Sequence, residues 1–136
     1  MADVTVTAAS VLQVSGQTKD VVAGEAITAG DWVYEDSTAS GKAKKADTSS
    51  QAKATVTGMA LNSAPAADQP LRIATSGVVK PGGTLTVGTI YVASDNGGKL
   101  RPAADNGSGD WVTELGVATA ADTLKIGLNV SGVQVP

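Results

Sequence analysis

The sequence contains one pattern twice, and this internal duplication constrains the fold more than any other feature. Residues 24–34 align with residues 82–92, so that Gly30 corresponds to Gly88. Further matching steps are Gly41-Lys42 with Gly98-Lys99, Gly58-Met59-Ala60 with Gly116-Val117-Ala118, and Leu71-Arg72-Ile73 with Leu124-Lys125-Ile126. Two copies of one supersecondary unit favour two halves around a shared core, whereas a solenoid needs about three repeats or more. The sequence therefore predicts two similar β units, at about 24–79 and 82–133; chance similarity between β-rich stretches is the alternative.

Short runs of β-branched and aliphatic residues, separated by Gly, Asp, Asn and Pro, predict an all-β fold. The expected strands are residues 4–7, 11–14, 32–35, 55–61, 71–74, 77–79, 90–93, 111–118 and 123–130. The run Asp95-Asn96-Gly97-Gly98 predicts a hairpin turn, because these residues tolerate positive φ. Residues 49–54 fit either a short helix or an irregular loop. We expect a small β-sandwich or β-barrel, and the pattern does not distinguish the two.

The composition argues against an enzyme. The chain has no Cys and no His, which removes thiol nucleophiles, the usual zinc ligands and the commonest general base. Its carboxylates stand mostly beside Gly, Ser or Asn, as in turns, and two Trp, two Tyr and no Phe make a poor platform for a sugar. The sequence therefore predicts a non-enzymatic protein without a cofactor or a bound metal.

One stretch resembles a calcium loop in composition only. Residues 105–110 read Asp-Asn-Gly-Ser-Gly-Asp, which supplies oxygen donors and flexible glycines. The alternating ligands and the terminal Glu of a calcium-binding loop are missing from the run. A solvated turn is the favoured interpretation.

The charge balance indicates a protein partner. The formal net charge is -3, which repels polyphosphate, and the one basic cluster has no interleaved aromatic residues: Lys42, Lys44, Lys45 and Lys53. No run approaches the roughly 18 apolar residues of a membrane span, and the first residues lack the pattern of a secretion signal. We therefore expect no nucleic-acid or membrane partner, and synthesis without export.

The first 16 residues lie outside both repeats. They predict an extended N-terminal arm, residues 1–16, ahead of a single β domain, residues 17–136. Apolar residues alternate there with polar ones, so the arm has strand character and could add to the sheet edge of a partner. An ordinary first strand of the domain is the alternative. Trp32 falls on a strand position and is expected to be buried, whereas Trp111 follows a turn and suits either the core or a subunit contact. The candidate contact residues are Val4, Val6, Val11, Leu12, Val14 and Trp111.

Several stretches resemble one family. Residues 23–30, the two Gly-Lys hairpins and the Gly58-Met59-Ala60 and Leu115-Gly116-Val117-Ala118 steps are similar to the capsid decoration, or cement, proteins of tailed bacteriophages, over roughly residues 21–133. The resemblance implies a structural virion protein, made in the host cytoplasm. It would bind the capsid exterior as a homotrimer and bridge subunits of the major capsid protein. The alternatives are a carbohydrate-binding or adhesive module, such as the base of a head fibre, and a head–tail or tail component.

Overall fold

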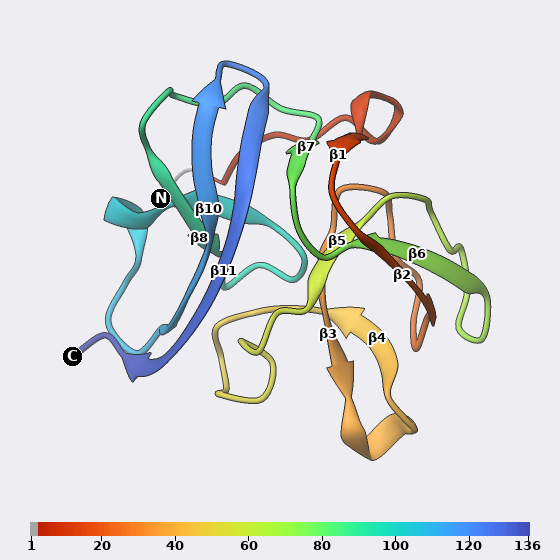
Figure 1. The fold of residues 1–136 in the computed structure, drawn as a ribbon. Helices are drawn as coiled ribbons and strands as arrows, with labels where there is room; N and C mark the ends of the chain where they lie inside the picture. Colours follow the sequence, from red (N-terminus) through yellow and green to blue (C-terminus); the bar gives the residue numbers. More distant parts are fainter. Residues whose placement is uncertain (1–2) are drawn as a thin grey trace.

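The computed structural model describes residues 3–136 as two antiparallel sheets packed as a sandwich (Figure 1). Sheet A has the strand order β1-β7-β11-β10-β8-β9 and sheet B the order β2-β6-β5-β3-β4. The strands of sheet A are β1 Leu12–Ser15, β7 Val78–Lys80, β8 Ile90–Ala93, β9 Leu100–Pro102, β10 Trp111–Ala120 and β11 Thr123–Gln134. Those of sheet B are β2 Thr18–Val22, β3 Trp32–Asp36, β4 Lys42–Lys45, β5 Gly58–Ala60 and β6 Pro70–Ala74. The all-β prediction is confirmed, and the fold is the sandwich.

Three short 3-10 helices complete the architecture: η1 Ala8–Ser10, η2 Ser37–Ala39 and η3 Ala103–Asp105. The hairpin predicted at residues 95–98 is confirmed, since β8 and β9 pair on either side of it. Residues 49–54 form bends and turns, which decides for the irregular loop over a helix.

The two repeated segments share one pairing scheme. The order β4-β3-β5-β6 in sheet B corresponds to β9-β8-β10-β11 in sheet A. The register agrees between β3 and β5 and between β8 and β10, because Trp32 pairs with Met59 and the corresponding Ile90 pairs with Val117. Between the next two strands it differs by two residues, since Met59 pairs with Ala74 but Val117 pairs with Lys125. Strand β2 precedes the first segment and lies beside β6, and β7, at the end of that segment, takes the same place beside β11. Each half of the sandwich is therefore one copy of the repeated unit.

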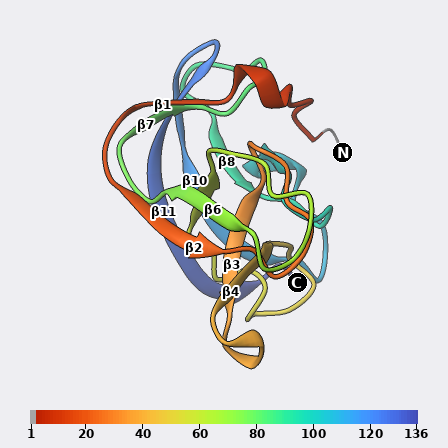
Figure 2. The ribbon, with the colours of Figure 1, turned by 90° about the vertical axis from the view of Figure 1, so that its right-hand side faces the viewer.

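Two glycines let the chain pass from one sheet to the other. Strand β1 of sheet A leads into β2 of sheet B, and β6 of sheet B leads back into β7 of sheet A, as a paired ribbon (Figure 2). A Cβ on Gly16 would lie 2.1 Å from the Ser76 carbonyl oxygen, and one on Gly77 would lie 2.1 Å from that of Ser15. The backbones cross so closely that a side chain at either glycine would collide with the other strand.

The main core is shared by both segments. Fully buried members include Trp32 and Met59 from the first segment, and Leu100, Leu115 and Leu124 from the second. The burial expected for Trp32 is therefore confirmed. A second, smaller cluster lies within the first segment, around Val33, Leu71 and Ile73. Most of the burial that stabilises the sandwich comes from such aliphatic side chains, each contributing about 1.5–3 kcal/mol.

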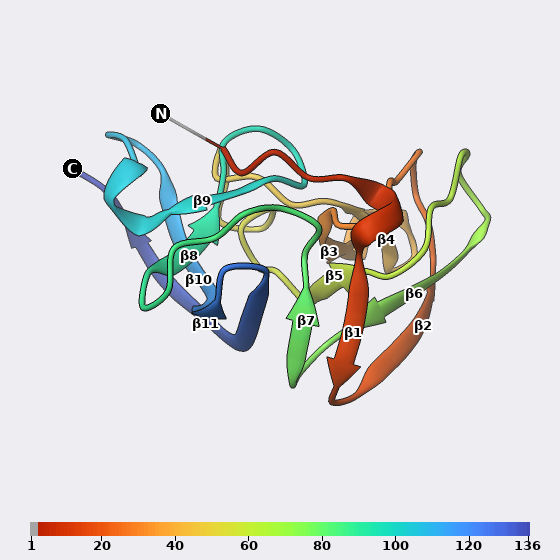
Figure 3. The same cartoon turned by 90° about the horizontal axis from the view of Figure 1, so that it is seen from above.

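The N-terminal segment is part of the domain rather than a free arm. Figure 3 shows it passing over the sandwich to β1, which lies beside β7. Val4, Val6 and Val11 are half-buried against the main core. The Val4 N–H donates to the Leu100 carbonyl at 2.9 Å, and the Thr7 N–H donates to the Gly82 carbonyl at 2.8 Å. The segment thus satisfies backbone groups of its own chain and covers its own core.

Three strands lie outside the predicted set, and one predicted strand is wrong. Strand β2 was not expected, because residues 18–20 are polar and two of them carry charges. Strands β4 and β9 follow the two Gly-Lys hairpins but were not among the predicted strands. Residues 4–7 are not a strand, since they lie along the domain with only isolated backbone hydrogen bonds. The predicted strand at residues 55–61 shortens to β5, where the chain meets both β3 and β6.

Candidate contact surface

The strand register places a mixed apolar row on the outer face of sheet A. Residues paired across a ladder project to the same face of a sheet. One such row crosses five neighbouring strands through Ser15, Val78, Lys125, Val117 and Ile90. Ile90 keeps 43% of its surface exposed, although it is a large aliphatic residue. This face therefore offers apolar contact area to solvent.

Strand β1 forms an open edge of this sheet. It pairs with β7 on one side and stands at the end of the strand order. Leu12 and Val14 are 54% and 56% exposed, and the strand, Leu-Gln-Val-Ser, carries no charge. An uncharged edge with exposed aliphatic side chains is a template for pairing with another strand. We call Leu12–Ser15 the β1 edge.

The β2 edge of sheet B carries charged side chains. Strand β2 is its terminal strand and carries Lys19 and Asp20. Lys19 pairs with Glu35 at 2.7 Å, and Asp20 pairs with Arg72 at 2.8 Å. The Arg72 guanidinium also lowers the pKa of the Asp20 carboxyl from its usual value. Charged side chains oppose strand addition, so of these two neighbouring edges the β1 edge is the one suited to pairing.

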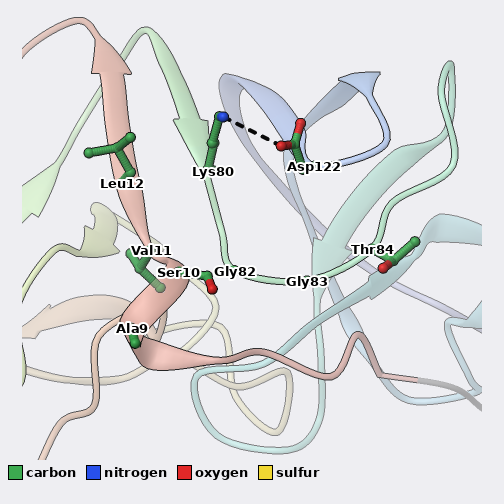
Figure 4. Close-up of a pocket in the computed structure, with 9 residues that line it drawn as sticks. All are labelled: Ala9, Ser10, Val11, Leu12, Lys80, Gly82, Gly83, Thr84 and Asp122. Carbon is green, nitrogen blue, oxygen red and sulfur yellow. Dashed lines mark ion pairs between the residues drawn. The ribbon is translucent and has the colours of Figure 1, made fainter.

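A broad groove of about 580 Å³ adjoins the β1 edge (Figure 4). The turn that carries Ala9 to Leu12 lies on one side, and the loop of residues 82–84 lies on the other. Lys80 and Asp122 also line it and form an ion pair at 3.4 Å. The groove extends the β1 edge into a surface with both apolar and charged contacts.

A second groove of about 310 Å³ lies in the middle of the outer face. Strands β8, β10 and β11 form it, with Glu114 and Lys125 as its charged residues and mainly apolar residues between them. We call it the sheet A groove. Its lining residues are Ile90, Glu114, Gly116, Val117, Lys125, Ile126 and Gly127.

The loop that resembles a calcium site in composition holds a guanidinium group instead. Arg101 is buried, and its Nη2 donates to Asp110 Oδ2 at 2.5 Å. Asp110 also accepts from Thr48 Oγ1 at 2.8 Å and from the Gly107 N–H at 2.7 Å. The carboxylate that ends the loop thus serves to fold it over β9. Among residues 3–136 no group of three or more acidic residues is arranged to hold a metal ion.

The comparisons with known proteins add no family to this picture. No family model and no curated protein matches the chain. Within residues 3–136, the helical segments include none with the length and apolar character needed to span a membrane.

The structure divides the six residues proposed from sequence. Val4, Val6 and Val11 pack on the core, whereas Leu12 and Val14 are exposed along the β1 edge. Trp111 lies half-buried on β10, three strands away from β1 in sheet A. Its backbone N–H donates to the Thr48 carbonyl at 3.1 Å. The proposed residues therefore do not form one site.

The sheet A groove was missed at the sequence level. Its members come from β8 and from the β10–β11 hairpin, about 20 residues later, and Ile90 aligns in the repeat with Trp32, which was expected to be buried. The available signal was the charge of Lys125 between the aliphatic residues Leu124 and Ile126, which marks an outward position.

Proposed function

We propose that this chain is a structural protein of a tailed-phage particle that binds the outer face of the capsid and bridges neighbouring subunits of the major capsid protein. It acts as a homotrimer, performs no chemistry and is made in the host cytoplasm. The observation that carries the proposal is the β1 edge, with its unpaired outer side and exposed Leu12 and Val14.

Strand addition explains how such an edge would hold a capsid. An extended segment of the partner would continue sheet A beyond β1 through main-chain hydrogen bonds, with its side chains against the exposed aliphatic pair. The adjoining groove and the Lys80–Asp122 ion pair would add polar contacts. Each contact is modest, but many copies on one shell act together and resist its opening.

The charge of the chain supports an exterior position. A net charge of -3 would be repelled by a packed polyanionic genome, whereas the outer surface carries no such penalty. Strand β1 is held at both ends, by the 3-10 helix η1 before it and by the close backbone crossing at Gly16 after it. A rigid edge loses less entropy on binding than a free arm would.

Binding to purified capsids tests the proposal. Val14→Lys places a charge on the β1 edge and should reduce occupancy of capsids that lack this protein by tenfold or more at a fixed concentration. Val22→Lys is the matched control: Val22 is 44% exposed at the end of β2, the edge that already carries charge. This control should occupy capsids as the wild type does.

Occupancy is measured by quantitative gel analysis of sedimented particles, with circular dichroism to show that each variant is folded. Folded Val14→Lys protein that occupies capsids fully would overturn the role of the β1 edge. Wild-type protein that leaves every tested capsid bare would overturn the proposed function.

A further inference from the structure

The two repeated segments differ in how one face of each sheet is covered. In the first segment, the residues on this face are buried in the main core: Trp32, Met59 and Ala74. In the sequence repeat, the corresponding residues of the second segment are Ile90, Val117 and Gly127. Lys125, rather than Gly127, pairs with Val117, and this shift of two residues leaves Gly127 on the same face of the sheet. These three line the sheet A groove and face outward. The same face of the repeated unit is therefore covered by protein in one half of the molecule and uncovered in the other.

The uncovered face has room for a partner. Ile90 is 43% exposed, and a Cβ built on Gly127 would meet no heavy atom within 4 Å. In the first segment the corresponding Ala74 is fully buried. In the first segment the chain packs its own residues against this face of the repeated unit. In the second segment the same face is apolar and open to solvent.

The charges of the groove identify the partner. Glu114 and Lys125 both line it, and neither forms an ion pair with any residue from 3 to 136. Glu114 lies opposite Asn129, and Lys125 lies opposite Val117, so the backbone positions that carry the two charges are roughly 10 Å apart along the strands. A groove with a negative and a positive charge at separate points is complementary in charge to a second copy of itself.

We propose that the sheet A groove packs against the same groove of a neighbouring copy, with Glu114 of one copy facing Lys125 of the next. Around the three-fold axis of the proposed homotrimer, the Glu114 side of each groove meets the Lys125 side of the next, so that three equivalent contacts close a ring. The inference deepens the proposed function, since it assigns the contact between copies to a surface separate from the β1 edge. Apolar residues between the charges supply the area, and the charges set the relative orientation.

Charge reversal on the full chain tests the contact. Glu114→Lys places lysine opposite lysine, and Lys125→Glu places glutamate opposite glutamate. Each single variant should associate at least roughly tenfold more weakly than the wild type, because like charges then meet at the contact. The double variant Glu114→Lys/Lys125→Glu restores opposite charges and should recover association. Lys53→Glu, at an exposed position of the loop of residues 46–57, changes the net charge as Lys125→Glu does and should associate as the wild type does.

Sedimentation velocity over a range of concentrations measures the association, and thermal unfolding shows that each variant is folded. A wild-type chain that stays monomeric throughout would overturn the inference. So would single variants that associate normally, or a double variant that remains as weak as the singles.

Capsid occupancy separates this inference from the proposed function. A chain that associates through the groove but leaves capsids bare supports the inference and overturns the proposed function. A chain that occupies capsids as a monomer does the reverse.

Discussion

Replacing Arg101 should destabilise the sandwich, because it removes one partner of a buried ion pair. Its side chain is 1% exposed and its partner Asp110 is 12% exposed, so both charges lie away from water. Arg101→Met keeps much of the side-chain volume but leaves the carboxylate of Asp110 with the donors of Thr48 and Gly107. Removing one partner of a buried ion pair costs about 3–5 kcal/mol. The two remaining donors place the expected loss at the lower end, about 3 kcal/mol, and the second partner of Arg101, Asp95, adds little because its side chain is 56% exposed.

Urea titration followed by tryptophan fluorescence measures this loss, and thermal unfolding should show a decrease on the order of 10 °C. Arg72→Met is the matched control, because the ion pair between Arg72 and Asp20 lies on the surface, and it should unfold as the wild type does. Arg101→Met/Asp110→Asn should recover about 1–2 kcal/mol relative to the single variant, since a neutral amide is less costly to leave buried. An Arg101→Met protein as stable as the control would refute this reasoning, as would a double variant no more stable than the single.

Three further substitutions address the backbone of sheet A and the buried carboxylate of Asp31. Gly116→Ala should destabilise by about 1–3 kcal/mol in urea titration, because its Cβ would lie 2.1 Å from the Lys125 carbonyl oxygen, whereas Gly127→Ala, in open space, should not destabilise. Equal stabilities of the two variants would contradict the close strand approach at Gly116. Burial raises the pKa of Asp31 above its usual 3.8, so the folded protein binds this proton more tightly than the unfolded chain and loses stability as pH rises from 3.8 through the raised pKa. Asp31→Asn should therefore be more stable than the wild type at pH 7 and lose that advantage below 3.8; an advantage unchanged in acid would contradict it.

Local chemistry explains what could be read from the sequence. The turn at residues 95–98 was predictable because its residues favour positive φ wherever they occur, and Gly98 adopts a φ of 78°. The strand pattern was readable where aliphatic residues dominate, as in β8 and β10. Strand β2 was not readable, because it is exposed over most of its length and its Lys and Asp are held by ion pairs to Glu35 and Arg72.

The position of the N-terminal segment could not be predicted from its sequence pattern. Val4, Val6 and Val11 have the alternation of a strand, and that alternation is compatible with a sheet edge in this chain or in another. The structure places them on the chain's own core, where the backbone of residues 3–11 donates hydrogen bonds to the carbonyls of Leu100 and Gly82. Contacts between residues so far apart in the chain depend on the closed fold rather than on neighbouring residues.

The sequence by itself determined the β class, the turns and the existence of two related units, since each depends on neighbouring residues or on a comparison within the chain. Only the tertiary structure decided which faces of those units are buried. Trp32 and Ile90 occupy the same place in the repeat, yet Trp32 is fully buried and Ile90 is 43% exposed. The physical reason is that burial depends on what packs against a face: the second segment covers Trp32, and nothing within residues 3–136 covers Ile90 to the same extent.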